Sequence, residues 1–299
     1  MNREARLDAL FIPGRLGPAA RGGLPAIELR HASGARAELA LQGAHVTAWQ
    51  GADGADRLFL SRCSRFQAGV PIRGGVPVVF PQFGAGPLPQ HGLARTRAWR
   101  PVRSAVEADG AVVAVLALES DEALLALWPH PFRLELAVAL ADTLSLSLAV
   151  ENTGTKPFAF QAALHTYFRV SDIAGARVIG LAGSAFQDFL GKLPGLERRE
   201  ALAFDAETDR LFTGVPDVVR VEDPGARRVL RIEKRGMPDV VVWNPWIDKA
   251  RCLEDLGDNE YRTMVCVETG AIRPPIGLAP GSRWLGRTVF RALQEGAPG

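Results

Sequence analysis

Two ionisable side chains, His165 and Glu268, interrupt apolar, strand-like runs in separate parts of the chain. An ionisable group is costly to bury unless a partner compensates it. Imidazole and carboxylate groups titrate on either side of neutrality, so together they supply a general acid and a general base. The two residues are therefore candidates for proton transfer, although a histidine considered alone is better explained as a hydrogen-bonded core residue.

The glutamate is harder to explain as structure. Strand alternation places Glu268 on the same face as Met264 and Cys266, which predicts that its carboxylate points inward. Lone buried carboxylates are uncommon, and their pKa values are often perturbed for function. Asp239 interrupts a second apolar run in the same way.

A segment rich in glycine and proline, residues 71–97, breaks the strand pattern. Proline lacks a backbone donor and glycine weakens strands, so this segment is expected to form a shaped loop. Arg73 precedes two glycines, and Arg95 follows in the same segment. Two converging guanidinium groups would suit a phosphate. Each arginine considered alone is better explained by a bond to a backbone carbonyl or a surface acid.

Composition excludes several classes of protein. The 299 residues are 47% hydrophobic and 23% charged, with a formal net charge of +2, which is typical of a globular protein. This charge balance predicts neither a nucleic-acid partner nor a membrane surface. The three cysteines, Cys63, Cys252 and Cys266, lack metal-ligand spacing, and the N-terminus does not resemble a secretory signal. Reduced thiols and a cytoplasmic location are therefore expected.

Short runs with a period of two, separated by glycine and proline, recur along the chain. They predict an all-β sandwich or barrel, with a helical turn or two expected only near residues 248–256. No internal repeat or flexible linker divides the chain, so residues 26–293 are expected to form a single domain after an N-terminal lead at residues 1–25. The strand-like runs are 25–30, 37–41, 45–49, 111–118, 133–140, 143–150, 158–168, 217–222, 229–233, 239–243, 263–269 and 284–291.

Five motifs, in order along the chain, resemble those of the hexose-6-phosphate mutarotases, or glucose-6-phosphate 1-epimerases, a branch of the aldose 1-epimerase superfamily. The resemblance extends from about Gly43 to Phe290 and does not include residues 1–25. The motifs are Arg-Gly-Gly-Val-Pro (73–77), Gln-His-Gly-Leu-Ala-Arg (90–95), His-Thr-Tyr-Phe (165–168), Asp-Val-Val-Val-Trp-Asn-Pro-Trp (239–246) and Cys-Val-Glu-Thr-Gly (266–270).

This resemblance implies a large antiparallel β-sandwich of the galactose mutarotase type, a supersandwich with few short helices and a site on its concave face. It implies that His165 is the general acid and Glu268 the general base. The substrate contacts that it implies are Arg73, Gln90, Arg95 and Asp239, the last as a ligand of a sugar hydroxyl, with His91 beside them.

The implied activity is exchange between the α and β anomers of a hexose 6-phosphate, with glucose 6-phosphate as the first candidate. Glu268 would accept the proton of the C1 hydroxyl while His165 donates one to the ring oxygen; rotation and reclosure then give the other anomer. No redox change or group transfer occurs, so neither a cofactor nor a metal is expected. The expected partner is a small sugar phosphate, and a monomer is the default.

Two other classes of function need consideration. A non-catalytic carbohydrate-binding module could use the same sandwich, but it would not require His165 and Glu268 together. A glycoside hydrolase would need two carboxylates flanking the bond that it cleaves. Glu268 and Asp239 could supply them, but the His-Thr-Tyr-Phe motif would then remain unexplained.

Overall fold

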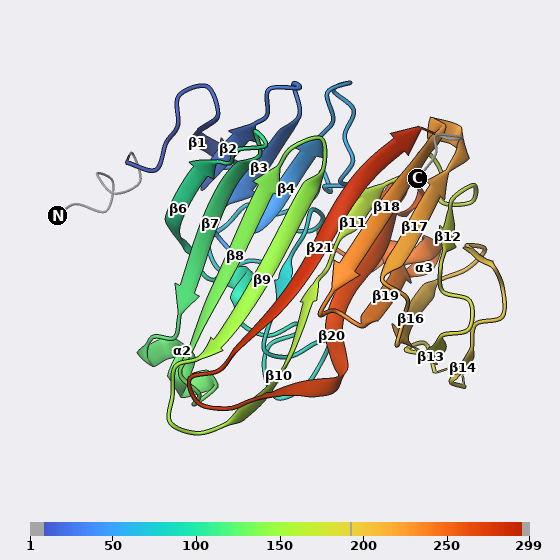
Figure 1. Cartoon of the computed structure of the whole chain (residues 1–299). Coiled ribbons are helices and arrows are strands. Elements are labelled where there is room, and N and C mark those ends of the chain that lie inside the picture. Colours follow the sequence, from blue (N-terminus) through green and yellow to red (C-terminus); the bar gives the residue numbers. More distant parts are fainter. Residues whose placement is uncertain (1–8, 192, 295–299) are drawn as a thin grey trace.

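The structure is a layered assembly of antiparallel β-sheets (Figure 1). It is a computed structural model that describes residues 9–191 and 193–294. All pairings between its named strands are antiparallel, which confirms the expected all-β sandwich. Within the described residues, no helix is long and apolar enough to cross a membrane.

Two sheets form the side of the molecule that carries the long loop of residues 71–97. The four-stranded sheet consists of β1 (Leu16–Arg21), β2 (Leu24–Arg30), β3 (Arg36–Ala40) and β4 (His45–Gln50). The eight-stranded sheet has the order β14 (Gly195–Leu196), β13 (Ala185–Asp188), β16 (Thr208–Thr213), β19 (Asp239–Asn244), β20 (Met264–Leu278), β10 (Phe158–Leu164) and β5 (Val78–Val79), and β11 (Tyr167–Arg169) also pairs with β20.

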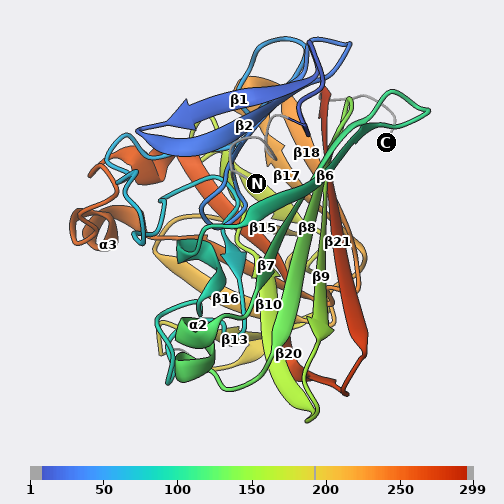
Figure 2. The ribbon, with the colours of Figure 1, turned by 90° about the vertical axis from the view of Figure 1, so that its left-hand side faces the viewer.

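A nine-stranded sheet forms the other layer. Figure 2 shows the molecule from the side, with β1 and β2 lying across one end of this layer. The order of the sheet is β15 (Ala201–Ala203), β12 (Arg177–Ile179), β17 (Val218–Asp223), β18 (Arg228–Arg235), β21 (Arg283–Gln294), β9 (Leu144–Asn152), β8 (Phe132–Leu140), β7 (Val112–Glu119) and β6 (Arg100–Val106).

Alternating burial fixes which side of each strand faces the core. Along β8 every second residue is buried, including Leu134 and Leu136, while the residues between them are half-buried. These leucines belong to one continuous buried cluster with Val240 and Val242 of β19, so the apolar faces of the two large sheets meet. Each fully buried leucine contributes about 1.5–3 kcal/mol relative to an exposed one. The opposite face of β19 is left free for the site.

Helices are few and short. The turn expected near residues 248–256 is α3 (Trp246–Arg251), and three 3₁₀ turns lie at Ala94–Thr96, Pro224–Ala226 and Glu260–Thr263. The helix α2 (Glu122–Leu127) was not expected from the sequence. Its start is set by Asp121, whose side chain accepts a hydrogen bond from the Leu124 amide at 2.8 Å.

The chain enters the folded sheets earlier than the expected boundary at residue 25. Leu16 and Leu24 are buried, and β1 pairs with β2 along its whole length. Leu16 gives β1 a buried anchor, and Leu24 does the same at the start of β2. The part of the expected lead at residues 1–8 lies outside the described residues.

The loop of residues 71–97 is irregular, as expected, and it packs closely against the sheets. Within it, only β5 and one 3₁₀ turn are regular. The backbone turns back at Gly74 and Gly75, where φ is +113° and +61°. A Cβ at Gly75 would lie 2.2 Å from the carbonyl oxygen of Val46 in β4. Glycine at this position therefore lets the loop run against β4 and present Arg73 to the concave face.

We expect Gly75→Ala to lower the free energy of unfolding by more than about 1 kcal/mol, because alanine is strained at this φ and its Cβ meets a backbone oxygen. Urea denaturation measures the loss. Gly277→Ala in β20 is the matched control, since a Cβ there meets nothing within 4 Å. Equal unfolding midpoints for the two variants would show that the loop does not need glycine at this position.

Candidate active site

The antiparallel register of β20 places Glu268 opposite His165. Leu164 of β10 pairs with Thr269, and Tyr167 of β11 pairs with Cys266. His165 lies in the short break between β10 and β11, where its amide donates to the Pro77 carbonyl at 3.0 Å. Directly opposed residues on antiparallel strands have Cβ atoms about 4.5–5.5 Å apart. The two candidates for proton transfer are therefore brought together by strand pairing.

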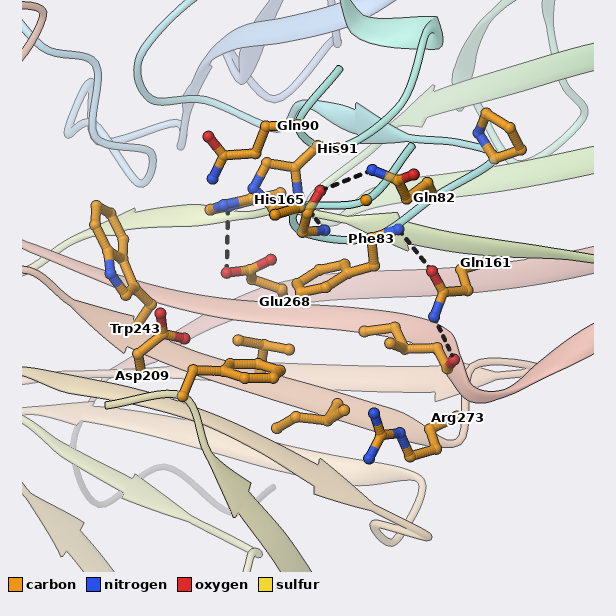
Figure 3. A pocket seen from close by; sticks show the side chains of 18 of the residues that line it. Gln82, Phe83, Gln90, His91, Gln161, His165, Asp209, Trp243, Glu268 and Arg273 are labelled. Atoms are coloured by element: carbon orange, nitrogen blue, oxygen red, sulfur yellow. Dashed lines mark hydrogen bonds and ion pairs between the residues drawn. The ribbon is translucent and has the colours of Figure 1, made fainter. Parts of the chain in front are cut away.

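Their side chains meet inside the concave face (Figure 3). Nδ1 of His165 lies 3.4 Å from Oε1 of Glu268, and the side chains are 8% and 2% exposed. Within the described part of the chain, Nδ1 of His165 and Oε2 of Glu268 have no hydrogen-bond partner. Buried polar atoms are nearly always satisfied in folded proteins. Two unsatisfied atoms on one facing pair indicate a place where a ligand binds.

Burial sets the protonation of this pair. Desolvation, reinforced by Asp209, raises the pKa of Glu268 well above its usual value, and Arg95 opposes this rise. Desolvation also lowers the pKa of His165 well below its usual value, assisted by His91, Arg95 and Arg73. Without substrate, the proton of the pair therefore resides on Glu268, and His165 is neutral.

The same pair forms part of a group that could in principle hold a metal. The group consists of His165, Cys266 and Glu268. Each residue offers one ligand atom, and these atoms lie within 4.8 Å of one another. Burial raises the pKa of the Cys266 thiol well above its usual value, and Glu268 raises it further. A metal would have to displace protons from both the thiol and the carboxyl group, with Arg73 and Arg95 nearby. The donor set fits a metal poorly.

A cavity of about 890 Å³ opens above the pair. This is within the range of about 300–1,000 Å³ for small-molecule sites. Trp243 forms one side of the cavity, and Phe83 and Gln161 lie toward the other (Figure 3). Gln161 stands at a bulge in β10, where it accepts from the Phe83 amide at 2.8 Å and donates to the Ile272 carbonyl at 3.0 Å. These bonds fix the position of Phe83.

The two predicted arginines lie close to the pair but in different settings. Arg73 lines the cavity, and its guanidinium donates to Asp255 and to the Tyr167 hydroxyl, each at 3.0 Å. Arg95 donates to the backbone carbonyl of Gln90 at 2.8 Å and is not among the residues lining the cavity. Its charge is nevertheless near enough to lower the pKa of His165. Both contacts match the alternative roles considered from the sequence, since Arg73 pairs with an acid and Arg95 binds a backbone carbonyl.

Gln90 and His91 both line the cavity, as Figure 3 shows. Gln90 is exposed, whereas His91 is buried and adopts a positive φ of 65°. Nδ1 of His91 accepts a bond from the Gly84 amide at 3.3 Å, and its ring centroid lies 5.1 Å from that of His165. Burial, with Arg95 and Arg73, lowers the pKa of His91 to about 3, so its ring stays neutral.

Asp239 has structural contacts that the sequence did not indicate. Its side chain is buried, but it is not among the residues lining the cavity. Oδ2 accepts backbone hydrogen bonds from Ile272 at 2.7 Å and from Arg273 at 2.8 Å. This carboxylate oxygen thus fixes the path of β20, whereas Oδ1 has no hydrogen-bond partner among the described residues, and its contact with a sugar hydroxyl stays a prediction. The sequence placed Asp239 on the correct face of β19, but it did not indicate that backbone amides donate hydrogen bonds to its carboxylate.

Asp209 is a cavity residue that the sequence did not indicate. It lines the cavity from β16, beside Trp243 on β19. Burial raises its pKa to about 7, with contributions from Glu207 and Asp188, while Lys249 lowers it. Asp209 lies in a charged stretch that is typical of a solvated surface. Only the pairing of β16 with β19 brings it to the site.

We expect the free energy of unfolding of Glu268→Gln to increase relative to that of the wild type as the pH rises. The unfolded chain releases the Glu268 proton from about pH 4.5, whereas the folded protein retains it to higher pH. The wild type therefore loses about 1.4 kcal/mol of unfolding free energy per pH unit above that point, and the variant avoids this loss. Urea denaturation at several pH values between 5 and 7 measures the difference.

Glu260→Gln is the control with the opposite sign. Burial opposes ionisation of Glu260, but bonds from the Arg62 amide, Ser61 and the Gly257 amide outweigh it and lower the pKa. Its stabilising effect is therefore present above the unfolded pKa and lost as the pH falls, so this variant should lose stability at neutral pH. If the difference in unfolding free energy between Glu268→Gln and the wild type did not change with pH, the folded protein would not hold a proton on Glu268.

Comparison with known proteins supports one family. The family model for aldose 1-epimerase matches residues 25–291. A Cenchrus ciliaris protein is 40% identical over 91% of this chain and 85% of its own length, and an Escherichia coli protein is 36% identical over 78% and 79%. Both are named "Putative glucose-6-phosphate 1-epimerase".

A solved structure shows the same fold. The Salmonella typhimurium protein YeaD, described as a "putative mutarotase", superposes with a TM-score of 0.88 at 28% identity. The match covers 98% of this chain and 100% of that one. The family match, the identity to relatives and the shared fold agree with one another. The chain belongs to the aldose 1-epimerase family.

Proposed function

We propose that the chain is a cofactor-independent 1-epimerase that interconverts the α and β anomers of a hexose 6-phosphate, most directly glucose 6-phosphate. The observation that carries this proposal is the His165–Glu268 pair, 3.4 Å apart and buried at the base of a cavity. The names of the relatives support the choice of substrate.

Ring opening needs two proton transfers at oxygens bonded to the same carbon. The C1 hydroxyl loses a proton while the ring oxygen gains one, and both oxygens are attached to C1. An acid and a base in mutual contact can reach two such oxygens without moving. Glu268 acts as the base at the hydroxyl, and His165 acts as the acid at the ring oxygen. After rotation about the C1–C2 bond, the reverse transfers close the ring on the other face.

Substrate binding places the proton correctly for this step. In the free protein the shared proton is on Glu268, partly because Arg73 and Arg95 disfavour a charged His165. A phosphate dianion beside these arginines offsets their charge. Arg95 lowers the pKa of both members of the pair, whereas Arg73 is a cause of the lowered pKa of His165 only, so the net effect favours the proton on His165. The proton then passes from Glu268 to His165, which gives a carboxylate base and an imidazolium acid. The phosphate thus assists the chemistry as well as the binding.

The phosphate site is built from Arg73 and Arg95. Asp255 already pairs with Arg73 at 3.0 Å, so this guanidinium is fixed in place but partly neutralised. Arg95 is half-buried, and desolvation lowers its pKa. A desolvated cation gains more from an incoming dianion than a cation that already has a carboxylate partner. Arg95 should therefore provide the larger share of the binding energy.

The alternative of a non-catalytic carbohydrate-binding module explains the cavity, but it does not explain the buried His165–Glu268 pair. Burying an imidazole and a carboxyl group together costs free energy, and hydroxyl or amide side chains would bind a sugar with less desolvation. Anomer exchange requires no oxidant, reductant or transferred group, so the residues described are sufficient for it.

Location and assembly remain predictions. Cys63 and Cys252 are exposed free thiols and Cys266 is a buried one, which suits a reducing cytoplasm. We expect a monomer, because the catalytic pair and the arginines all come from one chain.

Glu268→Gln and His165→Ala should each lower the anomer-exchange rate by about 10²–10⁴-fold, because each removes one of the two proton-transfer groups. Exchange NMR on glucose 6-phosphate measures this rate at equilibrium. The matched control is Glu254→Gln, which changes an acid that pairs with Arg65 at the surface. Near wild-type exchange in either site variant, with native circular dichroism, would refute the assigned pair.

Arg73→Ala and Arg95→Ala should lower kcat/KM for glucose 6-phosphate by about 10–100-fold, as expected for the loss of charge-assisted hydrogen bonds. Arg95→Ala should have the larger effect, and activity on unphosphorylated glucose should change little in either variant. Arg65→Ala removes an exposed arginine and is the control. Normal efficiency on glucose 6-phosphate in both site variants would exclude the phosphate clamp.

A further inference from the structure

Tyr167 of the His-Thr-Tyr-Phe motif links the loop of residues 71–97 to the catalytic pair. The residue is buried, with 2% of its surface exposed. A buried hydroxyl group usually has a hydrogen-bond partner. Within the described part of the chain, the Tyr167 side chain makes one hydrogen bond, in which its hydroxyl accepts from Nη1 of Arg73 at 3.0 Å. The tyrosine therefore contacts one of the two arginines assigned to the phosphate.

The ring of Tyr167 also lies against the imidazole of His165. The two ring centroids are 4.8 Å apart and the planes differ by 5°, so the rings are stacked. The rings of His91 and Trp243 also lie near His165, but they stand at 76° and 82° to it. A stacked neighbour limits rotation of the imidazole, and this keeps Nδ1 of His165 facing Oε1 of Glu268.

The backbone and the ring of Tyr167 are fixed without the hydroxyl. Its amide donates to the Gly75 carbonyl at 2.9 Å, and its carbonyl accepts from the Phe59 amide at 3.0 Å. The Phe59 ring packs against the Tyr167 ring, with centroids 6.4 Å apart. In β11, Tyr167 also pairs with Cys266 of β20. Removing the hydroxyl should therefore leave the ring stacked on His165.

The hydroxyl suits the task of holding Arg73. Asp255 accepts from this guanidinium at 3.0 Å, and the Tyr167 hydroxyl accepts from it at the same distance. A second carboxylate in this place would cancel charge that a phosphate needs, whereas a neutral oxygen fixes the guanidinium and leaves its charge intact. Burial raises the pKa of the Tyr167 hydroxyl above its usual value, so the oxygen stays neutral. An arginine that is already ordered loses less side-chain freedom when an anion binds.

The ring suits the charged form of His165. A cation that lies over an aromatic face within about 6 Å of the centroid is stabilised by the ring. Desolvation, together with His91, Arg95 and Arg73, disfavours a charged His165 in the free protein. After proton transfer from Glu268, the imidazolium would lie on the face of the Tyr167 ring. The ring then offsets part of the cost of this cation and adds no charge to the site.

We propose that Tyr167 is a positioning residue with two separable roles: its hydroxyl orients Arg73 for the 6-phosphate, and its ring orients His165 and stabilises the imidazolium. Tyr167 acts through these two residues, and it neither accepts nor donates a proton in the reaction. This inference rests on the proposed epimerase function and adds a residue to its machinery.

The test measures kcat and KM for glucose 6-phosphate by exchange NMR over a range of concentrations, on the intact protein. Tyr167→Phe removes only the hydroxyl, so KM should rise about fivefold or more while kcat stays within about twofold. Tyr167→Leu removes the ring as well, so kcat should also fall about tenfold. Tyr261→Phe changes the other tyrosine of the chain, which packs on Trp246 and is not among the residues lining the cavity. This control should change neither constant.

The same variants in an Arg73→Ala background separate an indirect role from a direct one. If the hydroxyl acts only through Arg73, adding Tyr167→Phe to Arg73→Ala should raise KM no further. Adding Tyr167→Leu should still lower kcat, because the ring acts through His165. If Tyr167→Leu does not show native circular dichroism, Tyr167→Met replaces it, since a flexible side chain can fill the same space.

Three results would overturn the proposal and leave the epimerase function intact. One is a wild-type KM in Tyr167→Phe, and another is an undiminished rise in KM when this change is added to Arg73→Ala. The third is a kcat in the variant without the ring that equals the kcat of Tyr167→Phe. No exchange of glucose 6-phosphate by the wild type would refute the epimerase function and this inference together.

Discussion

The whole site depends on the antiparallel pairing of β20 with the β10–β11 segment. This register sets His165 opposite Glu268, and a shift of one residue would turn Glu268 toward the other face of the sheet. The pairing with β19 on the other side of β20 sets Val241 beside Glu268, and the pairing of β19 with β16 sets Asp209 beside Trp243. Strand β20 therefore positions the proposed acid–base pair within the concave sheet.

The sequence predicted the parts of the structure that repeat and the residues that stand out chemically. Alternating apolar runs predicted most of the long strands, and the motifs indicated His165 and Glu268, which the fold brings within 3.4 Å of each other. Short strands such as β13 (4 residues) and β16 (6 residues) were not predicted, because runs this short with mixed polar and apolar residues carry little periodicity. Asp209 was not predicted either, because its burial depends on the pairing of β16 with β19, two strands that are far apart in the sequence.

Asp239 shows a different limit of sequence reasoning. Its type, burial and strand face all suited a ligand, and those features were predicted correctly. What decided its contacts was the course of the backbone at Ile272 and Arg273, whose amides point at its carboxylate. No local pattern encodes which distant amides will reach a side chain. A buried carboxylate can thus be recognised from sequence, whereas its partners cannot.

Electrostatics connects the phosphate site to the catalytic pair. The arginines that we propose to bind a dianion also lower the pKa of His165 in the free protein, in addition to desolvation and His91. A neutral pair is easier to keep buried than an ion pair, because neither member bears a charge that must be desolvated. The charged form, which catalysis requires, becomes favourable when the phosphate balances the arginines. The same arrangement of charges then accounts for a stable protein without substrate and a reactive pair with it. A neutral sugar would bring no charge to offset the arginines, even if it fitted the cavity equally well.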